Sequence, residues 1–505
     1  MRRPTVAVLA LAILGGSLVA CGSDEPARAC ASALVAQVRA VGGDAAGTNG
    51  PLDWVECRGG AEVAALAVPI DREQPAGGDL VLAIARRPAS GDRIGSLLVN
   101  PGGPGASALG LALLADDVFP TALTERFDIV AWDPRGVGLS EGFDCVDDAT
   151  MARWWGTDRS PDDAAERAAV VAAGETIAAG CARQHPDALG HVATVDTVHD
   201  VEAIRVALGD DTISYLGFSY GTLIGARYAD EFPDRVRAMV LDGAVDPART
   251  TEQAIAEQAA GFEHALEAFL DDCAAQDDCA FTSGGDPRTA YDRLLAAIDA
   301  EELYAVDLAG DERGLGPGEA DLGVATGLYD GRAGWPRLAE ALGGAARGDA
   351  SQLLQLADEY AQRSAEGVYD DGLEASYAIG CLDGPQPTPA QLRRLADELA
   401  RELPHFGAAT AWYGAPCASW SAPPKGAPRE VRAAGAPPIV VIGTTGDPAS
   451  PYEWAESLAG QLADGVLVTH DDEGHLAYLR GDACVDDAVH RYLVDLVVPA
   501  PGTRC

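Results

Sequence analysis

The most reactive arrangement in the sequence is a serine between two glycines, in the segment Gly217-Phe218-Ser219-Tyr220-Gly221. An apolar run, residues 212–217, leads into it, and a stretch with helical spacing follows it. A strand-to-helix turn with small residues two positions before and after the serine exposes the hydroxyl at the carboxyl edge of a sheet. A hydroxyl is a weak nucleophile at neutral pH, so it needs a base and an acid that orients the base. The motif therefore predicts acyl transfer through Ser219.

Two later segments supply the base and the acid in the order Ser, Asp, His. Asp447 lies in a loop directly after the apolar run 438–443. His475 follows the next apolar run, residues 465–469. We expect Asp447 to orient the imidazole of His475, and His475 to move the serine proton.

Other side chains could take these two roles. Asp242 also ends a predicted strand, which is another place for the acid. His470 lies at a strand end, whereas His490 falls within the last predicted helix, where a surface or core role is more typical. These residues remain alternatives at the level of the sequence.

Acyl transfer also requires N–H donors for the oxyanion. The segment Asn100-Pro101-Gly102-Gly103-Pro104-Gly105 follows an apolar run, and adjacent glycines let the backbone approach a substrate carbonyl. We expect one donor to be the N–H of Gly102 or Gly103, with Gly103 preferred, and the other to be the N–H of Tyr220. No Gly-Lys-Ser/Thr follows, so the segment is not a phosphate loop.

These residues must be positioned by an alternation of strands and helices. From about residue 60 the chain alternates short apolar runs with helical stretches, which is typical of βαβ units. Between about 246 and 430 only helical spacing recurs. The fold class is therefore α/β, with a mostly parallel central sheet and a helical lid inserted before the last core strands. The expected division is a first core part at 51–245, the lid at 246–430 and a second core part at 431–505. The predicted strands are 80–85, 95–100, 127–132, 212–217, 238–242, 438–443 and 465–469.

The first residues indicate export. Two arginines precede an apolar run, residues 6–19, which is the pattern of a secretory signal and is too short for a permanent membrane helix. Leu18-Val19-Ala20-Cys21 resembles a bacterial lipobox, which predicts a lipoprotein signal peptide at 1–20, lipidation of Cys21 and a tether at 21–50. The protein would then be anchored by lipid to the outer face of the cell membrane, with partial release outside the cell. An ordinary signal peptide is the alternative.

The cysteines fit an oxidising compartment. Eleven are present, and ten remain if Cys21 carries lipid. An even number in an exported protein suggests five disulfides. There is no Cys-x-x-Cys pair, so zinc is not expected. Proximity in the chain favours the pairs Cys30–Cys57, Cys145–Cys181, Cys273–Cys279, Cys381–Cys417 and Cys484–Cys505.

The composition of the chain limits the kinds of partner that it could bind. The 505 residues include 36 Lys and Arg against 78 Asp and Glu, a formal net charge of −42. Such acidity argues against nucleic acid, which is bound mainly through cations. The acidity also disfavours binding of anionic lipid by a cluster of basic residues. Any membrane contact would therefore be through the lipid anchor alone.

Several motifs together resemble the prolyl and tripeptidyl aminopeptidase branch of the α/β-hydrolase superfamily, most closely its exported tripeptidyl-aminopeptidase-like serine hydrolases. They are spread over about residues 50–505. The prolyl aminopeptidases have His where this chain has Pro101. The motifs are Pro101–Gly105, Asp133-Pro-Arg-Gly-Val-Gly-Leu-Ser140, Gly217-Phe-Ser-Tyr-Gly-Thr222, Leu241-Asp-Gly243, Gly446-Asp-Pro448, Gly474-His475 and Pro501-Gly-Thr-Arg-Cys505.

The resemblance implies a serine exopeptidase that releases short peptides, typically tripeptides, from peptide substrates with free N-termini. It implies the triad Ser219, Asp447 and His475 and no metal or organic cofactor. A carboxylesterase or lipase with the same triad is the nearest alternative. A binding lipoprotein on an inactive hydrolase scaffold is a further one.

Recognition of a free N-terminus calls for a carboxylate in a partly closed pocket. The lid is rich in acids, among them Asp321, Glu374 and Asp383. Asp383 is the preferred candidate of the three, because a Cys381 bridge would fix its backbone.

Overall fold

A computed structural model describes residues 32, 34–36, 38, 51–57, 59–282 and 285–505. The predicted signal peptide, the lipidation site Cys21 and most of the predicted tether lie outside these residues. Among the helices that are described, we find none with both the length and the hydrophobicity to cross a membrane.

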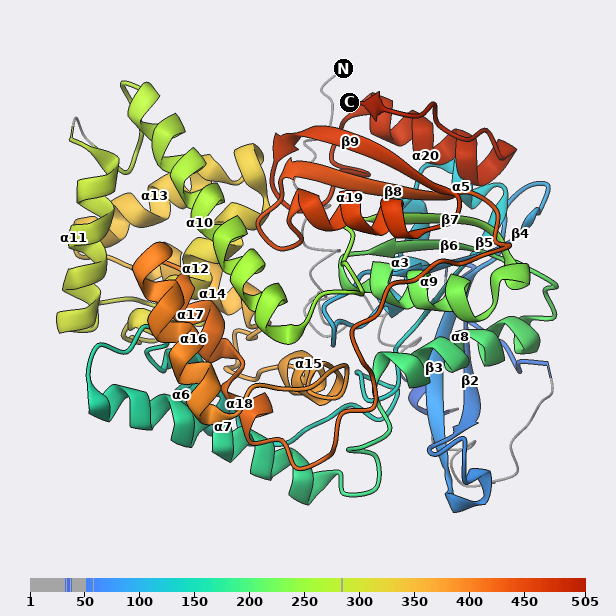
Figure 1. The fold of residues 1–505 in the computed structure, drawn as a ribbon, viewed down its shortest axis with the longest axis horizontal. Coiled ribbons are helices and arrows are strands. Elements are labelled where there is room, and N and C mark those ends of the chain that lie inside the picture. The colour runs from blue at the N-terminus through green and yellow to red at the C-terminus, as the bar shows by residue number, and fades with distance from the viewer. Residues whose placement is uncertain (1–31, 33, 37, 39–50, 58, 283–284) are drawn as a thin grey trace.

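A ten-stranded sheet forms the right-hand half of the molecule in Figure 1. Its order is β1-β2-β3-β5-β4-β6-β7-β8-β9-β10, and the strands from β5 to β10 in that order run parallel. All seven predicted strands are present, whereas the antiparallel strand β2 was not predicted. The bounds are β1 (Val55–Glu56), β2 (Glu62–Pro69), β3 (Asp79–Arg87), β4 (Gly95–Asn100), β5 (Phe127–Trp132), β6 (Ile213–Phe218), β7 (Val236–Asp242), β8 (Ile439–Gly446), β9 (Gly465–Glu473) and β10 (Thr503–Arg504).

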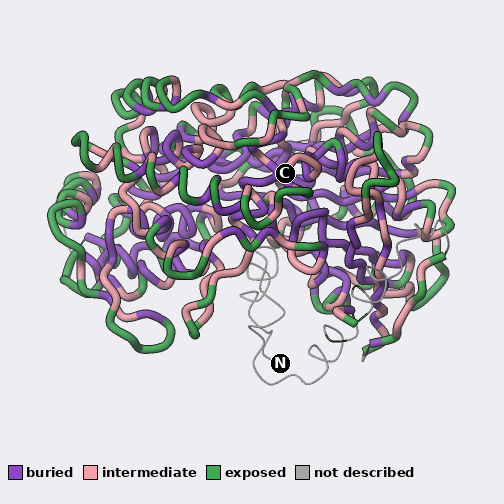
Figure 2. The backbone as a smooth tube through the Cα atoms, turned by 90° about the horizontal axis from the view of Figure 1, so that it is seen from below, coloured by how far each residue is buried: buried purple, intermediate pink, exposed green. Residues whose placement is uncertain are grey.

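Helices cover both faces of this sheet, so its central strands are apolar on both sides. Along β4, Leu97 and Val99 enter one hydrophobic cluster and Leu98 enters the other. The buried backbone in Figure 2 accordingly runs through the middle of the molecule, with exposed segments around it. One face carries α8 (Thr194–Leu208), α9 (Tyr220–Glu231) and α19 (Tyr452–Gln461), and the other α3 (Leu109–Leu113), α4 (Ala115–Val118), α5 (Thr121–Thr124) and α20 (Ala483–Asp495).

The chain between β7 and β8 is helical and forms the left-hand half of the molecule, which we call the cap (Figure 1). The cap has a hydrophobic cluster of its own, with Phe269, Leu342 and Leu353 among its fully buried residues. Its helices are α10 (Thr251–Ala275), α11 (Pro287–Ala300), α12 (Pro317–Tyr329), α13 (Trp335–Ala346), α14 (Ser351–Tyr360), α15 (Gly372–Gly380), α16 (Pro389–Glu402), α17 (Gly407–Tyr413) and α18 (Ala415–Ala418).

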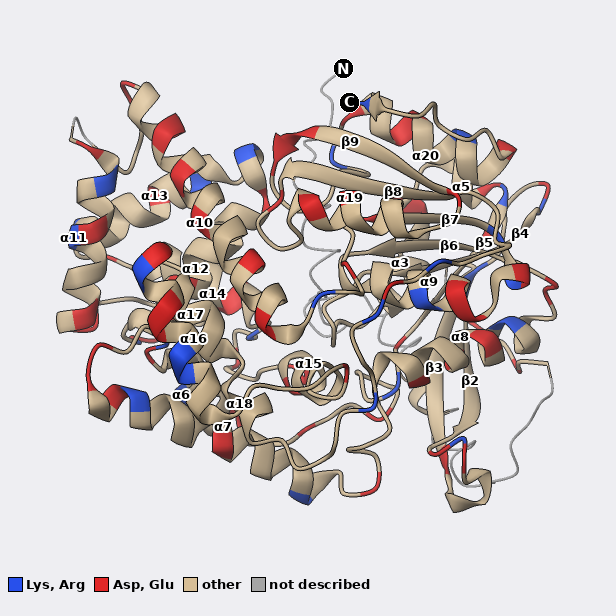
Figure 3. Ribbon diagram, in the orientation of Figure 1, with Lys and Arg blue, Asp and Glu red and all other residues tan. Residues whose placement is uncertain are grey.

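Two helices from the first core part also pack against the cap. They are α6 (Asp148–Gly156), which contacts α12, and α7 (Ala164–Gln184), which contacts α15 and α18. The helical half is therefore built from two separate stretches of chain. Acidic residues outnumber basic ones in the sequence, and residues of both kinds are spread over both halves (Figure 3).

Four of the predicted disulfides are present, and Cys57 is also disulfide-bonded. The predicted partner of Cys57, Cys30, lies outside the described residues. The four bridges are Cys145–Cys181, Cys273–Cys279, Cys381–Cys417 and Cys484–Cys505.

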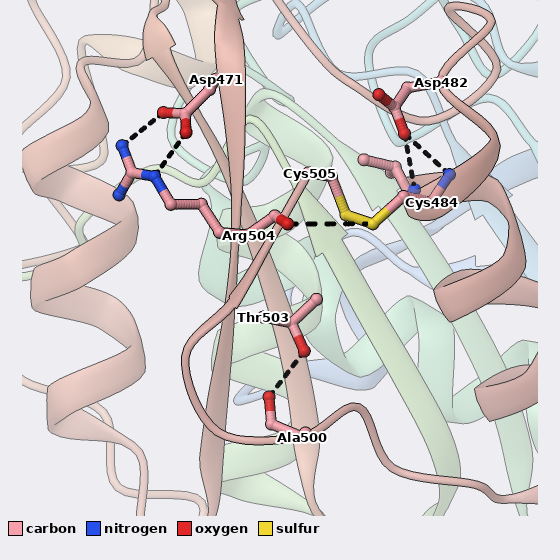
Figure 4. The surroundings of a disulfide bond; sticks show 8 residues. Asp471, Asp482, Cys484, Ala500, Thr503, Arg504 and Cys505 are labelled. Carbon is pink, nitrogen blue, oxygen red and sulfur yellow. Dashed lines mark hydrogen bonds and ion pairs between the residues drawn. A yellow bond between two sulfur atoms is a disulfide. The ribbon is translucent and has the colours of Figure 1, made fainter.

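The last bridge joins the segment that follows β10 to α20 (Figure 4). Cys505 is joined to Cys484 on α20, and its N–H donates to the carbonyl of Thr469 at 2.8 Å. Beside it, the guanidinium of Arg504 forms an ion pair with Asp471. These contacts hold β10 against β9, the strand that leads to His475.

Candidate active site

Ser219 stands at the sharp turn between β6 and α9. Its φ of 52° and ψ of −126° are unfavourable for a residue with a side chain, which is typical of a nucleophile held in a strained elbow. The turn leaves no room at the flanking glycines. A Cβ on Gly217 would lie 2.5 Å from the carbonyl oxygen of Gly221, and one on Gly221 would lie 2.6 Å from that of Asn100. The spacing in the sequence thus reflects a steric requirement.

The structure places His475 against Asp447. Both carboxylate oxygens of Asp447 lie 2.9 Å from Nδ1 of the imidazole, and both residues are buried. His475 and Ser219 line the same cavity. An imidazole that donates from Nδ1 to a carboxylate keeps Nε2 free to accept a proton.

Ser450 supports this pair and was not predicted. Its hydroxyl donates to Oδ2 of Asp447 at 2.9 Å and lies 3.3 Å from Nδ1 of His475. The N–H groups of Ala449 and Ser450 both donate to Oδ1 of Asp447, at 2.9 and 2.8 Å. An aspartate followed by a serine three positions later is a common turn pattern, so the sequence carried only a weak signal for it.

The alternative acid and bases have other partners. Asp242 is fully buried and accepts N–H bonds from Ala477 and Tyr478, just after His475. Burial raises the pKa of Asp242 to about 6. Nδ1 of His470 lies 3.2 Å from the hydroxyl of Thr444.

His490, the other alternative base, forms a hydrogen bond with the hydroxyl of Tyr478 at 2.9 Å. Burial lowers the pKa of His490. Among the described residues, neither it nor His470 lines the cavity that holds Ser219. The geometry thus favours the Asp447–His475 pair over each alternative.

The glycine-rich loop after β4 packs directly on the elbow. A Cβ on Gly102 would lie 2.9 Å from both the Cβ of Ser219 and the backbone nitrogen of Tyr220. The N–H of Gly102 donates to Oδ1 of Asn100 at 3.0 Å, so it is already engaged. Gly103 lines the cavity, which favours its N–H over that of Gly102 as an oxyanion donor.

The cap helps to position His475. The N–H of His475 donates to the carbonyl of Tyr329, the last residue of α12, at 2.8 Å. The two rings meet edge to face with centroids 5.3 Å apart. Arg480 donates to the carbonyls of both residues. The position of the imidazole therefore depends on cap and core together.

The cavity that joins Ser219 and His475 has a volume of about 400 Å³ and lies between the sheet edge and the cap. Its wall combines six aromatic residues with small and aliphatic ones, and the charged residues among the described lining, besides His475, are Asp321, Asp370 and Arg159. The aromatic residues are Trp155, Phe262, Tyr329, Tyr360, Phe406 and Tyr413.

The preference for Asp383 as the ligand of a substrate amine was wrong. Its carboxylate accepts the N–H of Thr194 at 2.8 Å and the hydroxyl of Thr194 at 2.6 Å, and Thr194 in turn bonds the hydroxyl of Tyr220. Asp383 lines a second hollow and not the cavity with Ser219. It therefore anchors the side chain of the residue after the nucleophile.

Of the other two acids, only Asp321 faces the cavity. Glu374 accepts N–H bonds from Cys145 and Val146 instead. Asp370, which the sequence did not single out, lines the cavity as well.

Groups spaced for a metal ion lie elsewhere in the described part of the chain. Two are acidic, Asp158–Glu166–Asp299 and Asp162–Asp163–Glu166, and the third includes Cys484 and Cys505, which are disulfide-bonded. None of these residues lines the cavity.

Comparison with known proteins covers nearly the whole chain. The model of an alpha/beta hydrolase fold matches residues 95–284, and that of a TAP-like protein matches residues 403–505. Serine protease Hip1 of Mycobacterium tuberculosis is 38% identical, with 94% of this chain and 96% of that protein covered. Carboxylesterase B of the same species is also 38% identical, over 88% and 86%. A tripeptidyl aminopeptidase of Streptomyces lividans is 30% identical, over 90% and 86%.

Proposed function

Because the chain belongs to the tripeptidyl-aminopeptidase-like serine hydrolases of the α/β-hydrolase superfamily, we propose that it is an exopeptidase. It would release short peptides, typically tripeptides, from the free N-termini of peptides. The observation that carries this proposal is the cavity beneath the cap, which is lined by Ser219, by the Asp447-bound His475 and by acids of the cap. Acids in the wall of the cavity suit a substrate that carries a terminal amine.

In the proposed reaction, the hydroxyl of Ser219 attacks the scissile carbonyl while His475 takes its proton. Asp447 accepts the Nδ1–H of the imidazole and stabilises the charge that forms on it. The N–H groups of Gly103 and Tyr220 stabilise the oxyanion. His475 then protonates the leaving amine, and a water activated by the same imidazole releases the acyl group from Ser219.

The cap supports an exopeptidase over an endopeptidase. A triad on an open sheet edge would accept any exposed peptide bond. Here α12 and α17 contribute Leu322, Tyr329 and Tyr413 to the wall of the cavity that contains the serine. A cavity of about 400 Å³ is within the roughly 300–1,000 Å³ of small-ligand sites, so it suits a short segment of substrate.

The test is mass spectrometry of the products from a mixture of peptides with free and acetylated N-termini. Release of tripeptides from the free peptides alone would support the proposal. Internal cleavage, or equal cleavage of acetylated peptides, would contradict it.

A carboxylesterase is the second candidate, because a relative that is 38% identical carries that name and six aromatic side chains line the cavity. The fold alone does not determine the leaving group. Rates on aminoacyl anilides and on esters of the same amino acids would distinguish an exopeptidase from a carboxylesterase, since an esterase would hydrolyse only the esters.

For location, we propose export and a lipid anchor at Cys21. Four disulfides among the described residues support an oxidising compartment. Replacing Cys21 by Ser should move the protein from the membrane fraction to the medium, and an unchanged distribution would contradict the anchor.

A further inference from the structure

One face of α12 leads away from the catalytic histidine along the cavity. Asp321, Ala325 and Tyr329 are spaced four residues apart on this helix, and all three line the cavity. The ring of Tyr329 packs on His475. Asp321 lies eight residues earlier, which is ~12 Å along the helix axis.

One oxygen of the Asp321 carboxylate has no hydrogen-bond partner in the described part of the chain. This oxygen, Oδ2, is buried. The nearby guanidinium of Arg159 donates instead to the carbonyls of Trp154, Trp155 and Gly318. Burial raises the pKa of Asp321 to about 7, although the charge of Arg159 opposes this. An unpaired buried carboxylate oxygen is unfavourable, and an incoming cation would provide its partner.

We propose that Asp321 binds the α-ammonium group of the substrate and thereby sets the number of residues that are released. The inference rests on the proposed exopeptidase function and specifies its recognition site. An extended peptide advances ~3.3–3.6 Å per residue, so three residues span about the same length as the two helical turns from Asp321 to Tyr329. The aromatic rings of the cavity wall would further stabilise the ammonium group.

Asp370 is the competing acid, and its position predicts a different product. It bonds the N–H of Gly372 at 3.0 Å, and a Cβ on Gly105 would lie 2.0 Å from the carbonyl oxygen of Gly372. Asp370 is therefore next to the glycine-rich loop that packs on Ser219. An ammonium bound beside that loop would favour the release of fewer residues than one bound at Asp321.

The experiment compares the full chain with its Asp321→Asn and Asp370→Asn variants. The substrates are trialanyl p-nitroanilide, its N-acetyl form, alanyl p-nitroanilide and p-nitrophenyl acetate. Glu374→Gln is the matched control, since Glu374 is a buried acid of the cap that does not line the cavity.

We expect Asp321→Asn to lower kcat/KM on the free trialanyl substrate about ten- to a hundredfold, mainly through KM, the range for a hydrogen bond to a charged group. Rates on the acetylated substrate and the ester should stay within about twofold of the wild type, and Glu374→Gln should leave all rates unchanged. These results together would support the assignment.

Failure of the assignment can be told apart from failure of the proposed function. If the wild type does not distinguish free from acetylated substrate, the exopeptidase proposal fails and this inference with it. If the wild type distinguishes them and Asp321→Asn still does, only the assignment of Asp321 is overturned. It is also overturned if Asp370→Asn alone removes the preference, or if Asp321→Asn loses the ester equally.

Discussion

Replacing Asp447 by Asn should stop the proposed reaction at the histidine while the fold stays intact. Oδ1 of Asp447 accepts the two backbone N–H groups of Ala449 and Ser450, Oδ2 accepts the Ser450 hydroxyl, and both oxygens lie 2.9 Å from Nδ1 of His475. An amide nitrogen cannot accept those N–H groups, so the oxygen of the new side chain must stay in the place of Oδ1. Its NH₂ group then donates to Nδ1 and leaves the imidazole proton on Nε2, where it blocks transfer from Ser219.

The expected loss in kcat is about 10⁴-fold, which corresponds to about 5 kcal/mol of transition-state stabilisation. Stability should change little, because both backbone N–H groups keep their acceptor. Asp242→Asn is the matched control. It also replaces a fully buried acid close to His475, but Asp242 contacts the backbone of Ala477 and Tyr478 and not the imidazole.

The assay is turnover of a tripeptidyl anilide, with the melting temperature measured on the same samples. Asp447→Asn should be almost inactive and Asp242→Asn should keep most of its activity. Retention of a tenth of the activity by Asp447→Asn, or the reverse order of the two variants, would refute this account of the triad.

The other predictions use the same assays. Ser219→Ala should abolish turnover and labelling by a fluorophosphonate with no loss of melting temperature, and residual activity above about a tenth would exclude Ser219 as the nucleophile. Cys381→Ser with Cys417→Ser opens a loop of about 37 residues and should cost roughly 3–4 kcal/mol in the chain-entropy model. The double variant should raise KM for the tripeptidyl anilide more than for a small activated ester. An equal loss of activity on both substrates would mean that the bridge supports the whole fold. Burial raises the pKa of Glu374 from 4.5 to about 8, so its contribution to stability is complete below about pH 4.5 and is lost as the pH rises through about 8. Urea unfolding at pH 5 and pH 8 should therefore show a smaller fall in stability for Glu374→Gln than for the wild type, and equal falls would contradict this.

The sequence predicted those parts of the site that depend on local sterics and strand ends. The elbow at Ser219 requires small neighbours, and Asp447 and His475 each follow a strand of a parallel sheet. Parallel strands bring such residues to one edge, so their meeting could be expected without a structure.

The cap could not be predicted in this way. Which acid faces the cavity depends on how each helix is rotated against the others, and the sequence does not encode this in any short motif. Proximity to a disulfide favoured Asp383, yet Asp383 anchors Thr194 and Tyr220, while Asp321 faces the cavity. Ser450 and Tyr329 act through contacts that only the folded chain creates.

The placement of the cap also determines the order in which the protein can assemble. β7 and β8 are paired in the sheet, but residues 243–438 lie between them in the chain. At ribosomal rates of ~5–20 residues per second, β8 is made roughly 10–40 s after β7, and the edge of β7 lacks its partner during that time. Ser219 is made early, whereas Asp447 and His475 follow only after the cap. The nascent chain therefore carries its nucleophile without the base that activates it while the 256 residues from 220 to 475 are made, so hydrolysis within the producing cell is delayed until the cap has been synthesised.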